Sequence, residues 1–152
     1  MKPSSRWLLA FGAAIGLLAI VAIVLVLIVG AREAPLLPEN TPEGIVQRYF
    51  LALKDGDYVT AYNYLSPKAT EKYPYGQWVP FVSSEERPGF KVTLGKSAVS
   101  DSEATVDVVV DVFRPGGPFD NPVRTQYVTF FLKKEGTSWK ITSPWDVWWL
   151  FY

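Results

Sequence analysis

The chain has 152 residues, enough for one ordinary domain and an additional segment but too few for two domains. It contains no cysteine and no histidine, so disulfides, thiolate or imidazole metal sites and Ser-His or Cys-His catalysis are excluded. Beyond residue 32, twelve basic residues accompany fifteen acidic ones, a balance unsuited to binding a phosphate backbone. We therefore expect no metal, no cofactor and no nucleic-acid partner.

Residues 7–30 form a stretch of 24 residues without a charged side chain. As a helix this stretch would extend about 36 Å, against about 30 Å of bilayer hydrocarbon. It predicts a transmembrane helix with the lipid bilayer as its partner. A cleaved signal peptide is the alternative, because Val29, Gly30 and Ala31 supply small residues, but its apolar part normally spans only about 7–15 residues.

The charges that flank this stretch predict its orientation. Lys2 and Arg6 precede it, whereas Arg32 follows it and is succeeded at once by Glu33. Basic residues are retained on the cytoplasmic side. We therefore expect residues 1–6 to be cytoplasmic and the rest of the chain to be extracytoplasmic, in a single-pass protein of the cell membrane.

Gly12 and Gly16 form a GxxxG pattern within residues 7–30. Two glycines one helical turn apart allow close approach of a second helix, so they are a candidate helix-dimer face and suggest a homodimer or a partner in a membrane complex. The alternative is that small residues are simply frequent in such helices.

Residues 31–41 read as a proline-rich linker, and residues 42–152 as one domain that begins with helices. Thr41 and Pro42 suit the start of a helix that ends at Asp55 and Gly56. Asp57 is expected to cap a second helix. Two shorter helical segments are expected, from Ser66 to Tyr73 and over 77–83.

From residue 90 the hydrophobic period changes to two, which is typical of strands. Strands are expected over 90–99, 104–114, 123–134 and 138–142, with a proline- and glycine-rich loop at 114–122. Val128, Phe130 and Leu132 are expected on one face of the third strand. Helices followed by an antiparallel meander predict an α+β fold, with the helices packed on one face of a curved sheet.

The segments PEGIVQRYFLALKDGDYVTAYNYLSP and WKITSPWDV resemble the nuclear transport factor 2-like superfamily of cone-shaped α+β domains, over residues 42 to about 147. The bacterial membrane-anchored extracytoplasmic members are the most similar type. The resemblance implies an N-terminal transmembrane helix followed by a nuclear transport factor 2-like cone. It includes isomerase-like and cyclase-like enzymes as well as non-catalytic modules, and the enzymes' Asp and His motifs have no match on this chain.

A group of aromatic residues is the candidate ligand pocket, with an unknown small-molecule ligand: Tyr62, Trp78, Phe81, Tyr127 and Trp139. The alternative is that these rings form the core. Asp107 and Asp111 share one strand face about 13 Å apart. They are expected to be solvated, and a buried general base is the alternative.

The aromatic C-terminal region is a candidate partner surface, carried by Trp145, Trp148, Trp149, Phe151 and Tyr152. Packing of this region onto the sheet is the alternative. These features favour a membrane-tethered, non-catalytic binding or interaction module. The alternatives are a small-molecule-binding or isomerase-like enzyme that uses the cone pocket, and a structural accessory subunit of a membrane complex.

Overall fold

The computed structural model describes residues 3–30, 35–83, 88–114, 117 and 121–147, and the side chains of residues 11–25 within the first helix. The chain divides into two units, Met1–Pro35 and Leu36–Tyr152. Each unit is described by itself.

The first unit contains the 28-residue helix α1 (Pro3–Gly30). Its described side chains, residues 11–25, are all exposed, and a Cβ added at Gly12 or Gly16 would meet no atom within 4 Å. The helix-dimer face at these glycines stays a prediction.

Among the residues that the structure describes, no helix is long and apolar enough to cross a membrane. The finding contradicts the predicted transmembrane helix over 7–30. It also contradicts the predicted single-pass location, with residues 1–6 in the cytoplasm and the domain outside.

The second unit begins with helix α2 (Pro42–Asp55), whose ends have clear chemical causes. The Thr41 hydroxyl accepts a hydrogen bond from the Gly44 amide at 3.1 Å, and Pro42 occupies the first turn. At the other end Gly56 has a φ of 74°, a left-handed conformation that glycine adopts without strain. Ile45, Tyr49 and other apolar residues of α2 are therefore held against the sheet.

Three short helices follow: α3 (Tyr58–Asn63), α4 (Pro67–Lys72) and α5 (Tyr75–Val82). Asp57 caps α3 through the Thr60 amide, and Ser66 caps α4 through the Ala69 amide. Pro74 precedes α5 directly, so this helix begins two residues before the predicted start at 77.

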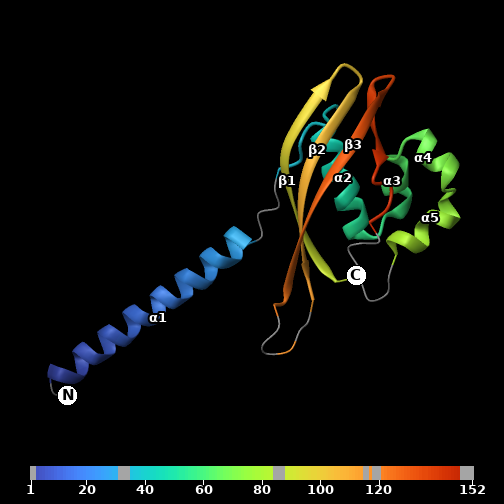
Figure 1. The fold of residues 1–152 in the computed structure, drawn as a ribbon. Coiled ribbons are helices and arrows are strands. Elements are labelled where there is room, and N and C mark those ends of the chain that lie inside the picture. Colours follow the sequence, from blue (N-terminus) through green and yellow to red (C-terminus); the bar gives the residue numbers. More distant parts are fainter. Residues whose placement is uncertain (1–2, 31–34, 84–87, 115–116, 118–120, 148–152) are drawn as a thin grey trace. The chain divides into compact units, whose positions relative to one another are not determined.

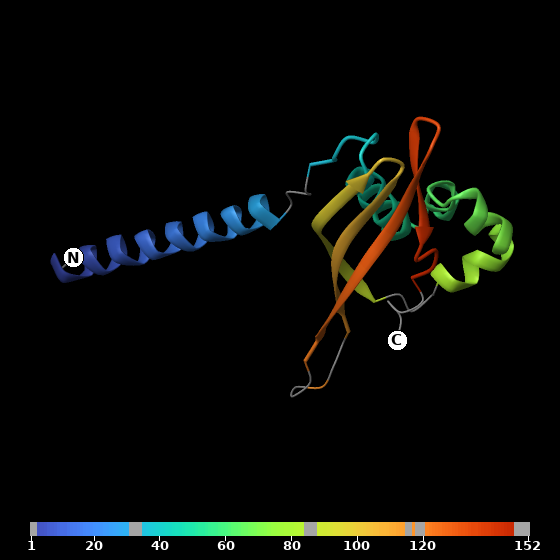
Figure 2. The ribbon, with the colours of Figure 1, turned by 45° about the horizontal axis from the view of Figure 1, so that its top comes forward.

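Four antiparallel strands complete the unit in sequential order: β1 (Gly89–Ser100), β2 (Glu103–Phe113), β3 (Val123–Glu135) and β4 (Ser138–Ser143). Figures 1 and 2 show α2 and the shorter helices on one side of this sheet. The fold is therefore α+β, as the order of the sequence patterns predicts.

The two faces of the sheet have different environments. On β2 the residues from Ala104 to Val112 in steps of two are 0–4% exposed and pack toward the helices, whereas Asp107 is exposed. Opposite residues of antiparallel strands share a face, so Thr129 lies beside Asp107 and Tyr127 lies beside Val109 on the outer side. The inner face supplies the core, and the outer face carries the polar half of the alternation.

Candidate interaction surface

The structure does not bring the five predicted pocket residues together. Tyr62 and Trp78 do make contact, with ring centroids 5.2 Å apart. Trp139 lies in the core at 5% exposure, and Phe81 lies at the surface of α5. Tyr127 is 81% exposed on the outer face of the sheet. These aromatic residues therefore do not line one cavity.

Side chains of the protein itself fill the space between α2 and the sheet. Phe50 packs edge-to-face against Phe130, with centroids 5.3 Å apart, and Tyr49 packs against both rings. The only buried polar or charged residue of the described chain is Ser66, which caps α4. The interior described by the structure thus contains no buried carboxylate that could serve as a general base.

Asp107 and Asp111 point away from this interior and are held by neighbouring threonines. The Thr129 hydroxyl donates to the Asp107 carboxylate at 2.8 Å, and the Thr125 hydroxyl donates to Asp111 at 2.7 Å. Both hydrogen bonds are exposed to solvent. Each carboxylate stabilises a cross-strand pair on the outer face, as expected for a solvated sheet surface.

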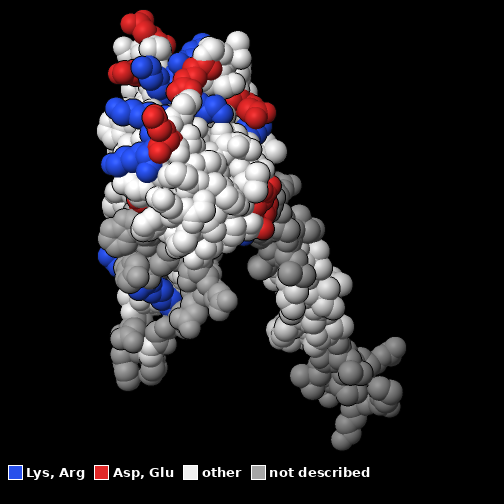
Figure 3. All heavy atoms as spheres, turned by 90° about the vertical axis from the view of Figure 1, so that its right-hand side faces the viewer, with Lys and Arg blue, Asp and Glu red and all other residues white. Residues whose placement is uncertain are grey.

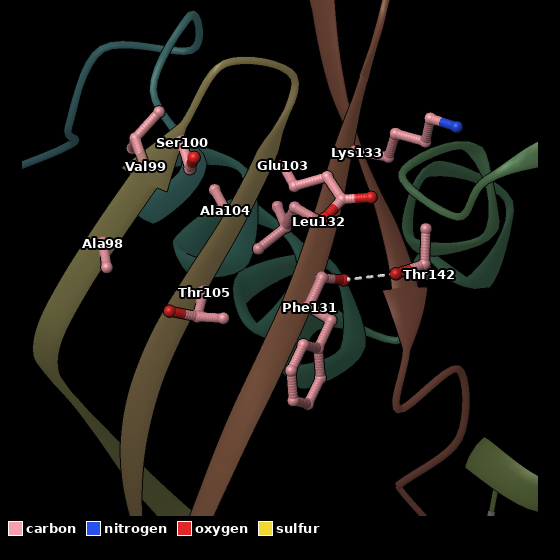
Figure 4. Close-up of a pocket in the computed structure, with 10 residues that line it drawn as sticks. All are labelled: Ala98, Val99, Ser100, Glu103, Ala104, Thr105, Phe131, Leu132, Lys133 and Thr142. Carbon is pink, nitrogen blue, oxygen red and sulfur yellow. Dashed lines mark hydrogen bonds between the residues drawn. The ribbon is translucent and has the colours of Figure 1, made fainter.

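A shallow groove of about 410 Å³ crosses one end of the sheet (Figure 4). It lies where Glu103 and Lys133 are paired across β2 and β3 and where the Phe131 ring is half exposed. Thr142 donates a hydrogen bond to the Phe131 carbonyl at 3.0 Å. Glu103 and Lys133, the two charged residues that line the groove, are both exposed.

A second surface gathers aromatic rings around α5, and we call it the aromatic surface, defined by Tyr73, Tyr75, Phe81 and Trp145. Tyr73 and Trp145 are stacked with centroids 3.5 Å apart, and Phe81 meets Trp145 edge-on at 5.8 Å. Tyr75 lies 6.3 Å from the ring of Trp78. Tyr75 and Phe81 are 39% and 43% exposed, so both rings remain accessible to a partner.

Buried groups beneath the aromatic surface hold it in place. The Trp78 ring is fully buried, and its Nε1 donates to the Trp145 carbonyl at 2.6 Å. The Tyr49 hydroxyl donates to the same carbonyl at 3.5 Å, and the Tyr62 hydroxyl donates to the Tyr73 carbonyl at 2.9 Å. A tyrosine hydroxyl is protonated near pH 7, and burial raises the pKa of Tyr49 and Tyr62 further, so both remain donors into the alkaline range.

The aromatic surface is poor in charge. Helix α5 has the sequence YGQWVPFV and carries no charged residue, whereas α4 carries Lys68, Glu71 and Lys72. Figure 3 shows this side of the molecule, with uncharged atoms across the middle and most charged atoms gathered above them. The Lys72 ammonium lies 5.1 Å from the Tyr73 ring centroid, at the border of the surface.

One residue of the predicted partner surface, Trp145, lies in the aromatic surface, and its role in binding a partner stays a prediction. Trp145 was predicted in a partner surface, while Trp148, Trp149, Phe151 and Tyr152 lie outside the described residues. Tyr73 and Tyr75 received no role, and Phe81 was assigned to a pocket. The uncharged run from residue 73 to residue 83, with aromatic residues on both sides of Pro74, was the available signal.

No group of His, Cys, Asp or Glu within the described ranges is arranged to hold a metal ion. The sequence contains neither histidine nor cysteine, so imidazole and thiolate ligands are excluded.

Neither the family models nor the curated proteins contain a match to this chain. Among solved structures, the chain is similar to the solution structure of RPA3114, a SEC-C motif containing protein from Rhodopseudomonas palustris. The similarity has a TM-score of 0.55 and 16% identity, and covers 78% of this chain and 84% of that chain. At this identity the similarity concerns the fold alone.

This comparison overturns the resemblance to the nuclear transport factor 2-like superfamily and the predicted cone. The structural neighbour is a SEC-C motif protein, and the sheet here is a simple four-stranded meander. The segments that suggested the superfamily encode a Gly56 helix end, an Asp57 cap and a closing strand, which are local features available to many α+β folds. What the comparison supports is an α+β fold shared with RPA3114.

Proposed function

We propose that this protein is a non-catalytic protein-interaction module whose aromatic surface binds an uncharged, apolar segment of a partner protein. The observation that carries the proposal is the pair of exposed rings, Tyr75 and Phe81, on a helix without charge. Tyr75 lies beside the buried Trp78, and Phe81 meets Trp145 edge-on. Tyrosine and tryptophan are enriched among residues that dominate binding energies at protein interfaces.

The packing beneath these rings supports this role. Trp145 is fixed by its stack on Tyr73 and by the hydrogen bond from Trp78 to its carbonyl. Side chains that are already held in place lose little conformational entropy on binding, so more of the contact energy appears as affinity.

The partner chemistry follows from charge. Because α5 offers no ion to pair with, a charged partner segment would lose hydration without compensation. An apolar or aromatic segment avoids that cost, and its binding depends little on ionic strength. The absence of a buried carboxylate in the described interior supports a non-catalytic role in the same way.

The test uses the tagged full-length chain expressed in its own cells, with quantitative recovery of bound proteins. The double variant Tyr75→Ser, Phe81→Ser removes the exposed rings of the aromatic surface. The matched control is Tyr127→Ser, Phe131→Ser, because these rings are 81% and 50% exposed on the outer sheet face.

We expect one or more partners to be recovered with the wild type and the sheet control, and at least tenfold less with the α5 variant. Recovery should change by less than twofold between low and high salt. Equal recovery with all three proteins, or loss only with the sheet control, would contradict the proposed function.

A further inference from the structure

The aromatic surface carries hydrogen-bond donors as well as rings. Within the described chain, the hydroxyls of Tyr73 and Tyr75 and the Nε1 of Trp145 take part in no hydrogen bond. Tyr73 and Trp145 are half-buried, and no buried side-chain nitrogen or oxygen of the described residues lacks a partner, so these two donors reach solvent. Tyr75 is itself 39% exposed. A segment that covers the aromatic surface therefore has to supply acceptors.

These donors restrict the conformation of the segment that covers them. A donor that loses water without gaining an acceptor weakens binding. An apolar helix uses its carbonyl groups for its own hydrogen bonds, so it would leave Tyr73 and Trp145 without acceptors. A polyproline II segment has no internal hydrogen bonds, and its carbonyl oxygens are free to accept. Proline also lacks a backbone N–H, so a proline-rich segment brings few donors of its own that need a partner.

The spacing of the exposed rings agrees with the polyproline II repeat. Tyr75 and Phe81 are six residues apart in α5, which corresponds to about 9 Å along the helix axis. A polyproline II segment rises about 3.1 Å per residue, so residues three positions apart are also separated by about 9 Å. Two prolines separated by two other residues can therefore each meet one of these rings.

We propose that the segment bound by the aromatic surface is proline-rich and adopts the polyproline II conformation. Its prolines pack on the rings of Tyr75 and Phe81. Its carbonyl groups accept hydrogen bonds from the Tyr73 hydroxyl and the Trp145 Nε1. This inference rests on the proposed function and adds the chemical class of the partner segment. Because polyproline II is formed before binding, such a segment loses little conformational entropy on the aromatic surface.

The test selects peptides of 12 residues from a random displayed library on the full-length chain. A parallel selection uses the full-length variant Tyr75→Ser, Phe81→Ser, so peptides that bind elsewhere on the chain are recovered in both selections. Circular dichroism verifies that the variant is folded. The peptide most enriched on the wild type alone is then synthesised, together with a version in which every proline is replaced by alanine.

We expect the enriched peptides to contain prolines three positions apart, and the synthetic peptide to bind at least tenfold more tightly than its alanine version. Tyr75→Ser, Phe81→Ser should weaken its binding at least tenfold. The sheet control Tyr127→Ser, Phe131→Ser should change the affinity by less than twofold. Enriched peptides without proline, or an alanine version that binds equally well, would overturn the proline-rich class.

The hydrogen bonds are tested with the rings kept in place. Tyr73→Phe removes the hydroxyl and keeps the ring that stacks on Trp145, so it should weaken peptide binding by about two- to tenfold. Tyr127→Phe on the outer face of the sheet is the matched control and should leave the affinity unchanged. Equal affinity of wild type and Tyr73→Phe would contradict the hydrogen bond from Tyr73.

The paired selection separates this inference from the proposed function. If the enriched peptides lack proline but depend on Tyr75 and Phe81, the proposed function stands and the proline-rich class fails. If both selections yield the same peptides, or if neither enriches any sequence, the proposed function fails together with the inference.

Discussion

The aromatic surface and the outer face of the sheet both expose large rings. Only in the aromatic surface do these rings pack against residues that are themselves held in place. Phe81 and Tyr75 contact Trp145 and Trp78, which are themselves held by packing and hydrogen bonds. On the sheet, Tyr127 is 81% exposed, between the Thr129–Asp107 and Thr125–Asp111 pairs. Exposure alone therefore does not identify a binding surface; exposed rings with rigid support form a better candidate.

The largest expected effect comes from removing that support. Trp78→Ala should lower the free energy of unfolding by about 3–5 kcal/mol, because it leaves a large cavity and removes the 2.6 Å hydrogen bond to the Trp145 carbonyl. Trp78→Phe, which keeps a ring but loses the donor, should cost less. Urea unfolding measures both, and an effect below about 1 kcal/mol for Trp78→Ala would show that the ring is not a support.

Because Tyr49 is buried beneath the aromatic surface, the free energy of unfolding should depend on pH in the alkaline range. Burial, with a smaller contribution from Asp146, raises the pKa of Tyr49, so its hydroxyl stays protonated in the folded state while the unfolded chain ionises near about pH 10. Below about pH 10 the ionisation of Tyr49 therefore does not reduce the free energy of unfolding. Above that pH the free energy of unfolding falls by up to about 1.4 kcal/mol per pH unit.

The measurement for Tyr49 is the urea midpoint at pH 9 and pH 11. Tyr49→Phe should show a smaller decrease than the wild type, although burial raises the pKa of Tyr62 and Tyr64 as well and leaves part of the slope. An identical decrease in both proteins would mean that Tyr49 ionises as readily in the folded state as in the unfolded chain.

Removing an exposed ring from the aromatic surface should lower the free energy of unfolding by less than Trp78→Ala does. Phe81→Ser loses one edge-on contact with Trp145, so we expect about 1 kcal/mol of destabilisation. Tyr127→Ser, the matched change on the sheet, should cost less than Phe81→Ser, since its ring is 81% exposed. Thermal unfolding compares the two, and the reverse order would contradict the difference in support.

The smallest effect is expected for the hydroxyls of the outer face. Thr129→Val removes the exposed hydrogen bond to Asp107 and keeps the branched shape, so it should change the unfolding free energy by about 0.5 kcal/mol or less. Thr125→Val at the other pair should behave alike, and the double variant should be additive. A loss above about 1.5 kcal/mol in urea unfolding would mean that these pairs are structural.

Local rules predicted much of the fold. Thr41, Asp57 and Ser66 cap helices because their side chains reach free amides, and the alternation from Ala104 to Val112 defines the buried face of β2. The same alternation, with Val128 and Phe130 inward, should have placed Tyr127 outside the pocket. The structure places Tyr127 on the outer face, apart from the other four rings, as this alternation indicates.

Other features depend on contacts between distant segments and could not be predicted from local patterns. Tyr73 and Trp145 are 72 positions apart, and no periodicity shows that they stack. The family resemblance was wrong because it rested on helix ends and one strand, which different α+β folds share. The absence of charged residues over 7–30 predicted a transmembrane helix, and the described residues of α1 do not support that prediction.

The central claim is that a partner protein binds at the aromatic surface. The most direct measurement places a photo-reactive phenylalanine analogue at position 81, or at position 127 as control, in the full-length chain in cells. The account predicts a discrete cross-linked product with a second protein from position 81 and at least tenfold less from position 127. Equal products from both positions, or a product from position 127 alone, would contradict it.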